Sequence, residues 1–153
     1  ALLQSRGPEL LGELLANIAK FKAAVQANFE LPIFLNSGDF PAGRFDPAKV
    51  VLRANQLGAS GVEIESLLIE QGIRVEMADR DTLVFLATLA DTKEDFQKLA
   101  SVLTGILKLV AATPRASATA LSWSVIPQVA ISMRDAYFAD TEFVLFGYKT
   151  PLL

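Results

Sequence analysis

The sequence contains no cysteine and no histidine among its 153 residues. Without cysteine the chain can form neither a disulfide nor a thiolate metal site, and its composition is compatible with a reducing compartment. Without histidine it cannot carry a Ser-His-Asp or Cys-His catalytic group, a histidine zinc site or the commonest general base.

Strong charge and long apolar runs are also missing. The net charge is only −3, so the composition shows no excess of basic residues of the kind that binds nucleic acid. No apolar run approaches the roughly 18 residues that a membrane-spanning helix requires. We therefore expect no nucleic-acid partner, no membrane segment and no signal peptide.

Apolar side chains, by contrast, are abundant. Hydrophobic residues make up 52% of the chain, and the mean hydropathy is +0.37. Both values are high for a single soluble domain. Such a chain has either a large core or an apolar surface that meets a partner, and we favour the partner.

A capped amphipathic helix is predicted over residues 61–71, in the stretch around which the rest of the chain is organised. Ser60 is a suitable N-cap, and Glu63, three residues later, completes the sequence pattern of a capping box. Apolar residues recur at helical spacing between them and Gly72. Glycine is the residue that most easily ends a helix in a left-handed conformation.

Two strands joined by a tight turn are predicted to follow this helix. Residues 73–77 alternate apolar and charged side chains, which is typical of a half-buried strand. Residues 78–81 are short and polar enough to turn the chain, and residues 82–87 are typical of a more buried strand. We expect the two strands to pair in antiparallel fashion.

Further elements complete an α+β fold class, with a small and mostly antiparallel sheet covered by helices. A strand is predicted over residues 49–54, and at most a short one over 33–35. Long amphipathic helices are predicted over residues 8–27 and 93–111, and for the first we favour a core-facing helix over a partner-binding one. Thr92 is the expected cap of the second, and Met133 to Ala139 is predicted to form a short helix.

The domain organisation that we predict has three parts. Residues 1–112 form the small α+β domain, residues 113–120 a small-residue linker, and residues 121–153 an irregular C-terminal arm or the start of a further domain. The last part holds six of the thirteen aromatic residues (10 Phe, 2 Tyr, 1 Trp) without an evident core of its own. We therefore interpret it as an arm that packs on something else; its aromatic residues are Trp123, Tyr137, Phe138, Phe143, Phe146 and Tyr148.

Most motifs that could carry chemistry have a simpler structural explanation. The stretch from Gly58 to Gly61 lacks the lysine and spacing of a phosphate-binding loop, so helix capping is favoured over anion binding. Several carboxylates could supply oxygen ligands, but their spacing does not follow a calcium loop, and we predict no metal site. These carboxylates are Asp79, Asp81, Asp91 and Asp95.

Glu76 is the residue that we single out, because it lies between the apolar Val75 and Met77 at the junction of helix and hairpin. It has two interpretations from pattern alone. One is a solvent-facing carboxylate on a half-exposed strand. The other is a carboxylate at the edge of a cleft, where it binds a cation through a charge-assisted hydrogen bond.

Three stretches in order resemble a known family: FDPAKV (45–50), LGASGVEIESLLIEQGIRVEMADRDTLVFLATLADTKEDFQKL (57–99) and SMRDAYFAD (132–140). They are similar to the C-terminal small domain, with the start of the C-terminal extension, of the Orn/Lys/Arg decarboxylases. These are pyridoxal-phosphate enzymes of the aspartate-aminotransferase fold type. The resemblance covers roughly residues 1–142, and residues 145–153 depart from what usually follows in the family.

The resemblance implies a cofactor site outside this chain. The family binds pyridoxal phosphate in an upstream domain, with a Schiff-base lysine in a Ser-x-His-Lys setting, an aspartate for the pyridinium nitrogen and a histidine over the ring. This chain has no histidine and no such motif, so we assign it no catalytic and no cofactor-binding residue. The family further implies that Glu76 recognises the distal cationic group of the substrate near a dimer interface.

Two hypotheses for function follow. In the first, the chain is part of a cytoplasmic, homo-oligomeric decarboxylase of lysine, arginine or ornithine in polyamine metabolism, and works with the upstream catalytic domain of the same protein. In the second, it is a stand-alone α+β binding or regulatory module that retains the fold but has no catalytic activity. Whether the source gene encodes several hundred residues before Ala1 would distinguish them.

Overall fold

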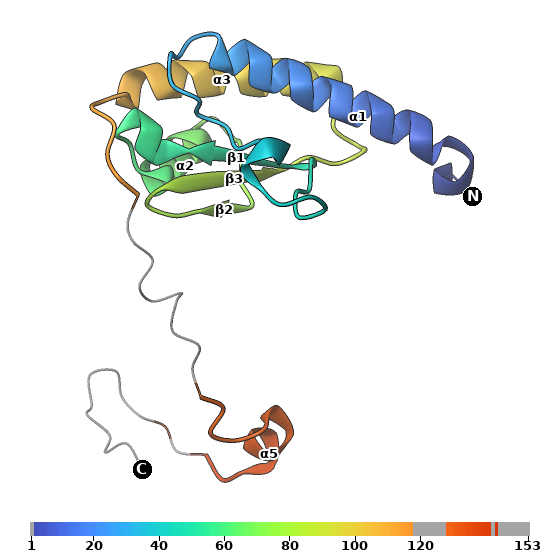
Figure 1. Ribbon diagram of the computed structural model, residues 1–153, viewed down its shortest axis with the longest axis vertical. Coiled ribbons are helices and arrows are strands. Elements are labelled where there is room, and N and C mark those ends of the chain that lie inside the picture. The colour runs from blue at the N-terminus through green and yellow to red at the C-terminus, as the bar shows by residue number, and fades with distance from the viewer. Residues whose placement is uncertain (1, 118–127, 142, 144–153) are drawn as a thin grey trace. The chain divides into compact units, whose positions relative to one another are not determined.

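The structure, a computed structural model, describes residues 2–117, 128–141 and 143. The chain divides into two compact units, Ala1–Ala118 and Thr119–Leu153. The first contains three α-helices, two short 3-10 helices and three strands among its described residues, and the predicted α+β fold is confirmed (Figure 1). In chain order these are α1 (Leu2–Gln26), η1 (Ser37–Asp39), β1 (Lys49–Arg53), η2 (Ala54–Leu57), α2 (Gly61–Glu70), β2 (Met77–Ala78), β3 (Thr82–Leu86) and α3 (Lys93–Val110).

The three strands form an antiparallel sheet in the order β1-β3-β2. In the β1–β3 pairing Leu52 lies opposite Leu83, and in the β2–β3 pairing Met77 lies opposite Val84. The segment expected to hold a short strand at most contributes an isolated bridge from Phe34 to Leu52. Figure 1 shows α1 and α3 lying across one side of this sheet.

The core lies between that side of the sheet and the helices. Alternate residues of β1 and β3 point inward and are buried, as the period of a strand requires. The ring of Phe21, from α1, lies at the centre of an aromatic cluster, with centroids 5.9, 6.4 and 6.1 Å from those of Phe34, Phe85 and Phe96. Such offset and edge-on ring pairs each add about 0.5–1.5 kcal/mol beyond area burial.

The loop after α2 explains why β2 is shorter than predicted. The strand begins at Met77 rather than at residue 73. Gly72 has φ 72°, its amide donates to the carbonyl of Ile69 (2.9 Å), and the amide of Ile73 donates to the carbonyl of Leu68 (2.9 Å). This pair of bonds closes the helix end, so Ile73 completes α2 instead of pairing with β3. The predicted glycine stop is confirmed, and the predicted antiparallel pairing holds only for the end of the segment.

The predicted start of the first helix is wrong, whereas α2 begins at Gly61 as predicted but without the expected capping bond. The first helix begins at Leu2, not at residue 8, and Pro8 lies inside it. The proline removes one hydrogen bond, to the carbonyl of the exposed Gln4, close to the start of the helix. At α2, Ser60 has extended N-cap geometry, but its side chain makes no capping bond, so the expected capping box is not formed. The capping box of Thr92 with Asp95 is present at α3.

The second unit contains α5 (Met133–Phe138), which confirms the predicted short helix there. The hydroxyl of Ser132 accepts a hydrogen bond from the amide of Asp135 and caps this helix. Six large apolar side chains of the described part of this unit are between 52% and 102% exposed. They are Val129, Ile131, Met133, Tyr137, Phe138 and Phe143. The aromatic residues Trp123, Phe146 and Tyr148 lie outside the described residues.

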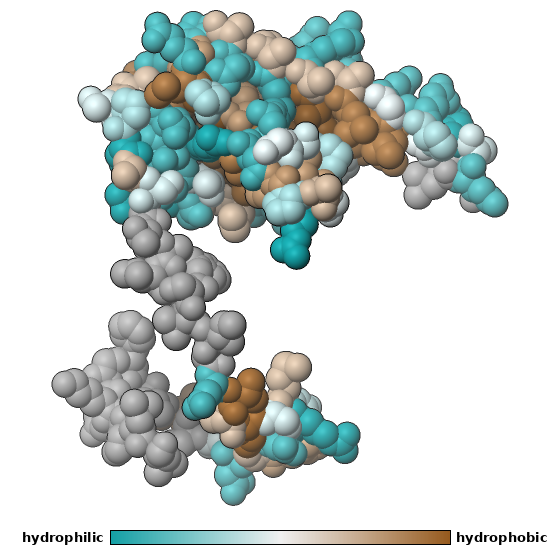
Figure 2. All heavy atoms as spheres, in the orientation of Figure 1, coloured by the Kyte–Doolittle hydropathy of each residue, from teal (hydrophilic) through white to brown (hydrophobic). Residues whose placement is uncertain are grey.

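Apolar side chains also reach the surface of the first unit, where Figure 2 shows brown areas beside α1. Leu11, Met77, Leu86 and Leu89 are between 41% and 52% exposed. Within the described ranges, we find no helix with the length and apolar character needed to cross a bilayer.

Candidate functional site

Glu76 lies one residue before β2 and is exposed. Its amide donates to the carbonyl of Val84 (2.9 Å), which holds its backbone on the edge of the sheet. The side chains beside it are the half-buried Val75 and the exposed Met77. Its carboxylate has no hydrogen-bond or ion-pair partner among the residues that the structure describes. The structure therefore places the carboxylate at the sheet edge with its full capacity to accept hydrogen bonds.

The turn that follows Glu76 is fixed by one side chain. The Oδ1 atom of Asp79 accepts hydrogen bonds from the amides of Asp81 (2.7 Å) and Thr82 (2.6 Å). The amide of Asp79 in turn donates to the carbonyl of Thr82 (3.0 Å). An aspartate that bonds to the backbone two and three residues ahead stabilises a turn in the way of an Asx motif.

Arg115, close to the C-terminal end of the first unit in the sequence, also contacts this turn. Its guanidinium donates to the carboxylate of Asp81, to the carbonyl of Arg80 and to the carbonyl of Ala59, the last at 2.9 Å. The Arg115 and Asp81 side chains are only 24% and 15% exposed. The segment predicted as a linker is therefore docked on the hairpin, at least as far as it is described.

Asn55, on η2, completes this attachment. It is 6% exposed and is the one buried polar residue among those described. Its side-chain amide donates to the backbone carbonyl of Arg115 (3.3 Å) and the hydroxyl of Ser117 (3.1 Å), and its backbone carbonyl accepts from the backbone amide of Arg115 (3.0 Å). Sequence reasoning missed this site; the only signal was a lone cation in a stretch of small residues.

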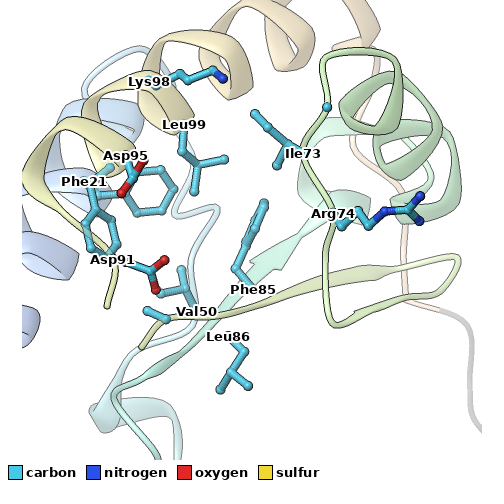
Figure 3. A pocket seen from close by; sticks show the side chains of 13 residues that line it. Phe21, Val50, Ile73, Arg74, Phe85, Leu86, Asp91, Asp95, Lys98 and Leu99 are labelled. Carbon is cyan, nitrogen blue, oxygen red and sulfur yellow. The ribbon is translucent and has the colours of Figure 1, made fainter. Parts of the chain in front are cut away.

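The fold also forms a cavity of about 310 Å³ between α3, β3 and the segment after Gly72 (Figure 3). In Figure 3 the side chains of Ile73, Phe85 and Leu99 point toward one another, whereas that of Arg74 points away. Sequence reasoning did not anticipate this cavity, because its walls come from segments far apart in the chain. Glu76 is not among the residues that line it.

Charged side chains stand at the edge of the cavity, with Asp91 and Asp95 on the wall that leads into α3 and Lys98 one turn further on. Asp91 Oδ2 accepts from the amide (2.6 Å) and hydroxyl (3.0 Å) of Thr88. Asp95 Oδ2 accepts from the hydroxyl (2.6 Å) and amide (2.9 Å) of Thr92. These bonds from Thr92, with a smaller effect of Lys98, hold the pKa of the Asp95 carboxyl below its ordinary value.

The four aspartates that were considered as metal ligands all bond to other groups of the protein. Asp79 fixes the turn, Asp81 pairs with Arg115, and Asp91 and Asp95 bond to threonines. No group of three or more potential ligand side chains gathers into a metal site in the described part of the chain.

The chain is similar to several curated proteins named arginine decarboxylase. It is 34% identical to that of Bacillus cereus over 108 residues, which are 67% of this chain and 23% of the relative. It is 29% identical to that of Bacillus subtilis over 109 residues, 70% of this chain and 22% of the relative. It is also 29% identical to that of Bacillus anthracis over 104 residues, 67% of this chain and 21% of the relative.

The match is partial on the side of the relatives, because the chain spans less than a quarter of their length. No family model matches the chain. No solved structure matches it either. Over about two thirds of its length, the chain is therefore related to decarboxylases.

Proposed function

We propose that the chain is the C-terminal part of a pyridoxal-phosphate-dependent decarboxylase of basic amino acids and is inactive by itself. The observation that carries this proposal is the likeness to proteins named arginine decarboxylase, of which the chain spans 21–23%. A match of that size leaves more than three quarters of such an enzyme to supply the catalytic centre. Arginine, lysine and ornithine are the candidate substrates.

The cofactor must be held by residues outside this chain, because those described here do not fit it. Pyridoxal phosphate supplies the electron sink for the carbanion that loss of CO₂ leaves behind. The sequence offers no histidine to stack on its ring. The 310 Å³ cavity carries Asp91 and Asp95, whose charges would repel a phosphate, and its one lysine, Lys98, is exposed. We derive no catalytic step from these residues.

The part that we assign to this chain is recognition of the substrate's side chain. Glu76 carries an unpartnered carboxylate, within the described structure, on a backbone fixed by Val84 and by the Asp79 turn. A guanidinium or ammonium group forms its strongest hydrogen bonds with such a carboxylate. Binding the distal cation would fix the substrate's pose without touching the bond that breaks.

Exposed apolar surface supports the expectation of partners, namely the rest of the same protein and further copies of it. Six large apolar side chains of the second unit are at least half exposed, which is unusual for an isolated soluble protein. In the assembled enzyme these side chains would be covered. The proposal therefore includes a homo-oligomer in which this chain forms one side of the active site.

The experiment compares this chain with a longer protein that includes any upstream coding sequence of the same gene. The longer protein, supplied with pyridoxal phosphate, should release CO₂ from at least one of arginine, lysine and ornithine. The 153-residue chain should release none and should acquire no visible absorbance band of covalently bound cofactor. An absorbance band or turnover from the 153-residue chain would refute the proposal that the cofactor site and catalytic centre lie outside this chain.

A stand-alone binding or regulatory module remains the alternative, favoured by one observation. The first unit has its own core, and its described buried side-chain polar atoms are all hydrogen-bonded. A unit of this kind can fold without a catalytic domain. The same experiment distinguishes the two, because a gene that encodes no upstream domain and a protein that releases no CO₂ would leave only the module.

A further inference from the structure

The cavity between α3 and β3 has an apolar interior and a charged edge, independently of any decarboxylase role. Phe85 and Phe96, which are 6% and 8% exposed, form part of its wall with the half-buried Ile73 and Leu99. Its volume of about 310 Å³ lies at the lower end of the range for small-molecule sites, roughly 300–1,000 Å³. A ligand that enters it must therefore be small and must bury an apolar group.

The charged groups at the edge keep unused binding capacity. In Asp91 and Asp95 the hydrogen bonds from Thr88 and Thr92 all go to one oxygen, Oδ2, so that Oδ1 of each has no partner in the described structure. The ammonium of Lys98 has no hydrogen bond or ion pair there either. The edge thus offers acceptors for a cationic group and a donor for an anionic one, from neighbouring positions on α3 and the loop before it.

We propose that this cavity binds a free α-amino acid with an apolar side chain. The ligand's ammonium group bonds to Asp91 and Asp95, its carboxylate bonds to Lys98, and its side chain packs on Phe85 and Leu99. Arg74 also lines the cavity, but its side chain points away from the interior (Figure 3). Of the remaining charged groups, the two aspartates would repel a simple anion and the lysine would repel a simple cation, so a zwitterion satisfies all three.

A basic amino acid does not fit the interior equally well. The inner walls are formed by aromatic rings and aliphatic groups, including Phe85, Phe96 and Val50. An ammonium or guanidinium buried there without a hydrogen-bonding partner would lose its hydration. The proposed ligand therefore differs from the substrate class of the proposed enzyme, and this site is distinct from Glu76.

The test is a titration of the full 153-residue chain, followed by the amide NMR signals of Ile73 and Leu99. L-norleucine is the probe, and three analogues each change one group: hexanoate lacks the ammonium, pentylamine lacks the carboxylate, and L-lysine adds a distal cation. L-norleucine should give saturable shifts and bind about tenfold more tightly than each analogue, the effect of one charge-assisted bond or one buried charge.

Three variants and one control test whether L-norleucine binds in this cavity. Lys98→Gln and Asp91→Asn should each raise the Kd for L-norleucine about tenfold, while Leu99→Trp should fill the cavity and abolish binding. Lys108→Gln, on the last turn of the same helix, is the matched control and should leave the Kd unchanged. Because Leu99→Trp could unfold the chain, its Tm is measured, and the Lys98 and Lys108 pair decides the outcome by itself. Non-saturable shifts, equal binding of pentylamine or hexanoate, or equal effects of the two lysine variants would overturn the proposal.

Discussion

The guanidinium of Arg115 bonds to the carboxylate of Asp81, 34 residues earlier in the chain. A second bond, to the carbonyl of Ala59 (2.9 Å), ties the same arginine to the loop before α2. Arg115 thus joins the end of the first unit to the turn that follows Glu76. The backbone that presents the candidate binding carboxylate is held in part by a residue outside the hairpin.

Replacing Arg115 should therefore destabilise the whole first unit. We expect Arg115→Met to lower the free energy of unfolding by about 2–3 kcal/mol, because it removes one donor to the mostly buried Asp81 carboxylate and the donor to the carbonyls of Arg80 and Ala59. Urea unfolding of the chain measures this change. Arg6→Met, which removes the 53% and 58% exposed pair of Arg6 with Glu9, is the control and should cost less than about 1 kcal/mol. Equal losses for the two variants would contradict the role given to Arg115.

The sequence predicted those features that depend on neighbours in the chain. Thr92 caps α3 and Gly72 ends α2 with a positive φ, because caps and stops are local motifs. Ser60 had an equally good local pattern and makes no capping bond. Arg115 had no pattern at all, since its partners are set by how the chain folds back on itself. The cavity was unpredictable for the same reason.

Gly61 shows why the start of α2 depends on tertiary packing. A Cβ atom at this position would lie 2.1 Å from the carbonyl oxygen of Thr82 and 2.4 Å from that of Asp79. Both atoms are backbone and cannot move aside without displacing β3 and its turn. The helix can begin here only because the residue has no side chain, a requirement that no capping rule contains.

Gly61→Ala should accordingly lower the free energy of unfolding by about 2–3 kcal/mol through overpacking. Gly105→Ala is the matched control, because a Cβ there meets nothing within 4 Å and lies in the interior of α3. That change should raise stability by about 0.5–1 kcal/mol through helix propensity. Thermal and urea unfolding of both variants measure the contrast. Stabilisation by both substitutions would mean that the backbone carbonyls of Thr82 and Asp79 do not lie against the start of α2.

The capping box at α3 should give the stability of the unit a dependence on acid. The hydroxyl and amide of Thr92 hold the pKa of Asp95 below its ordinary value of 3.8. Because the folded pKa is the lower one, the stabilisation is complete above pH 3.8 and is lost as the pH falls through the folded value. The stability difference between wild type and Asp95→Asn should therefore be constant at neutral pH and shrink below pH 3.8.

Urea unfolding at a series of pH values tests this dependence. Thr92→Val removes the hydroxyl that contributes most to the shift, so its unfolding should vary less with pH over the same acid range than that of the wild type. If Thr92→Val retained the full acid dependence, the capping bond would not be its cause.

Glu76 has two interpretations that an experiment with substrate distinguishes. The pattern allowed a solvent-facing carboxylate or a cation-binding one, and the structure gives it an exposed position with no partner in the described residues. An exposed carboxylate satisfies both interpretations in this chain alone. Under the proposed function, the two interpretations differ only when the rest of the enzyme and a basic substrate are present, because only then would the carboxylate lose water and gain a cation.

In a full-length enzyme, Glu76→Gln should lower kcat/KM for the basic amino acid by roughly 30- to 1,000-fold, which corresponds to about 2–4 kcal/mol for a desolvated charged pair. Steady-state kinetics measure the effect. Tm should change little, because Glu76 is exposed and is not part of the core, and cofactor absorbance should change little if the cofactor is held outside this chain as proposed. Glu70→Gln, which removes the last carboxylate of α2, is the matched control and should leave kcat/KM unchanged. Unaltered activity of Glu76→Gln, or a loss that arises from weaker cofactor binding, would show that Glu76 is only a residue of the sheet edge. A loss confined to basic substrates would instead identify it as the group that binds their distal cation.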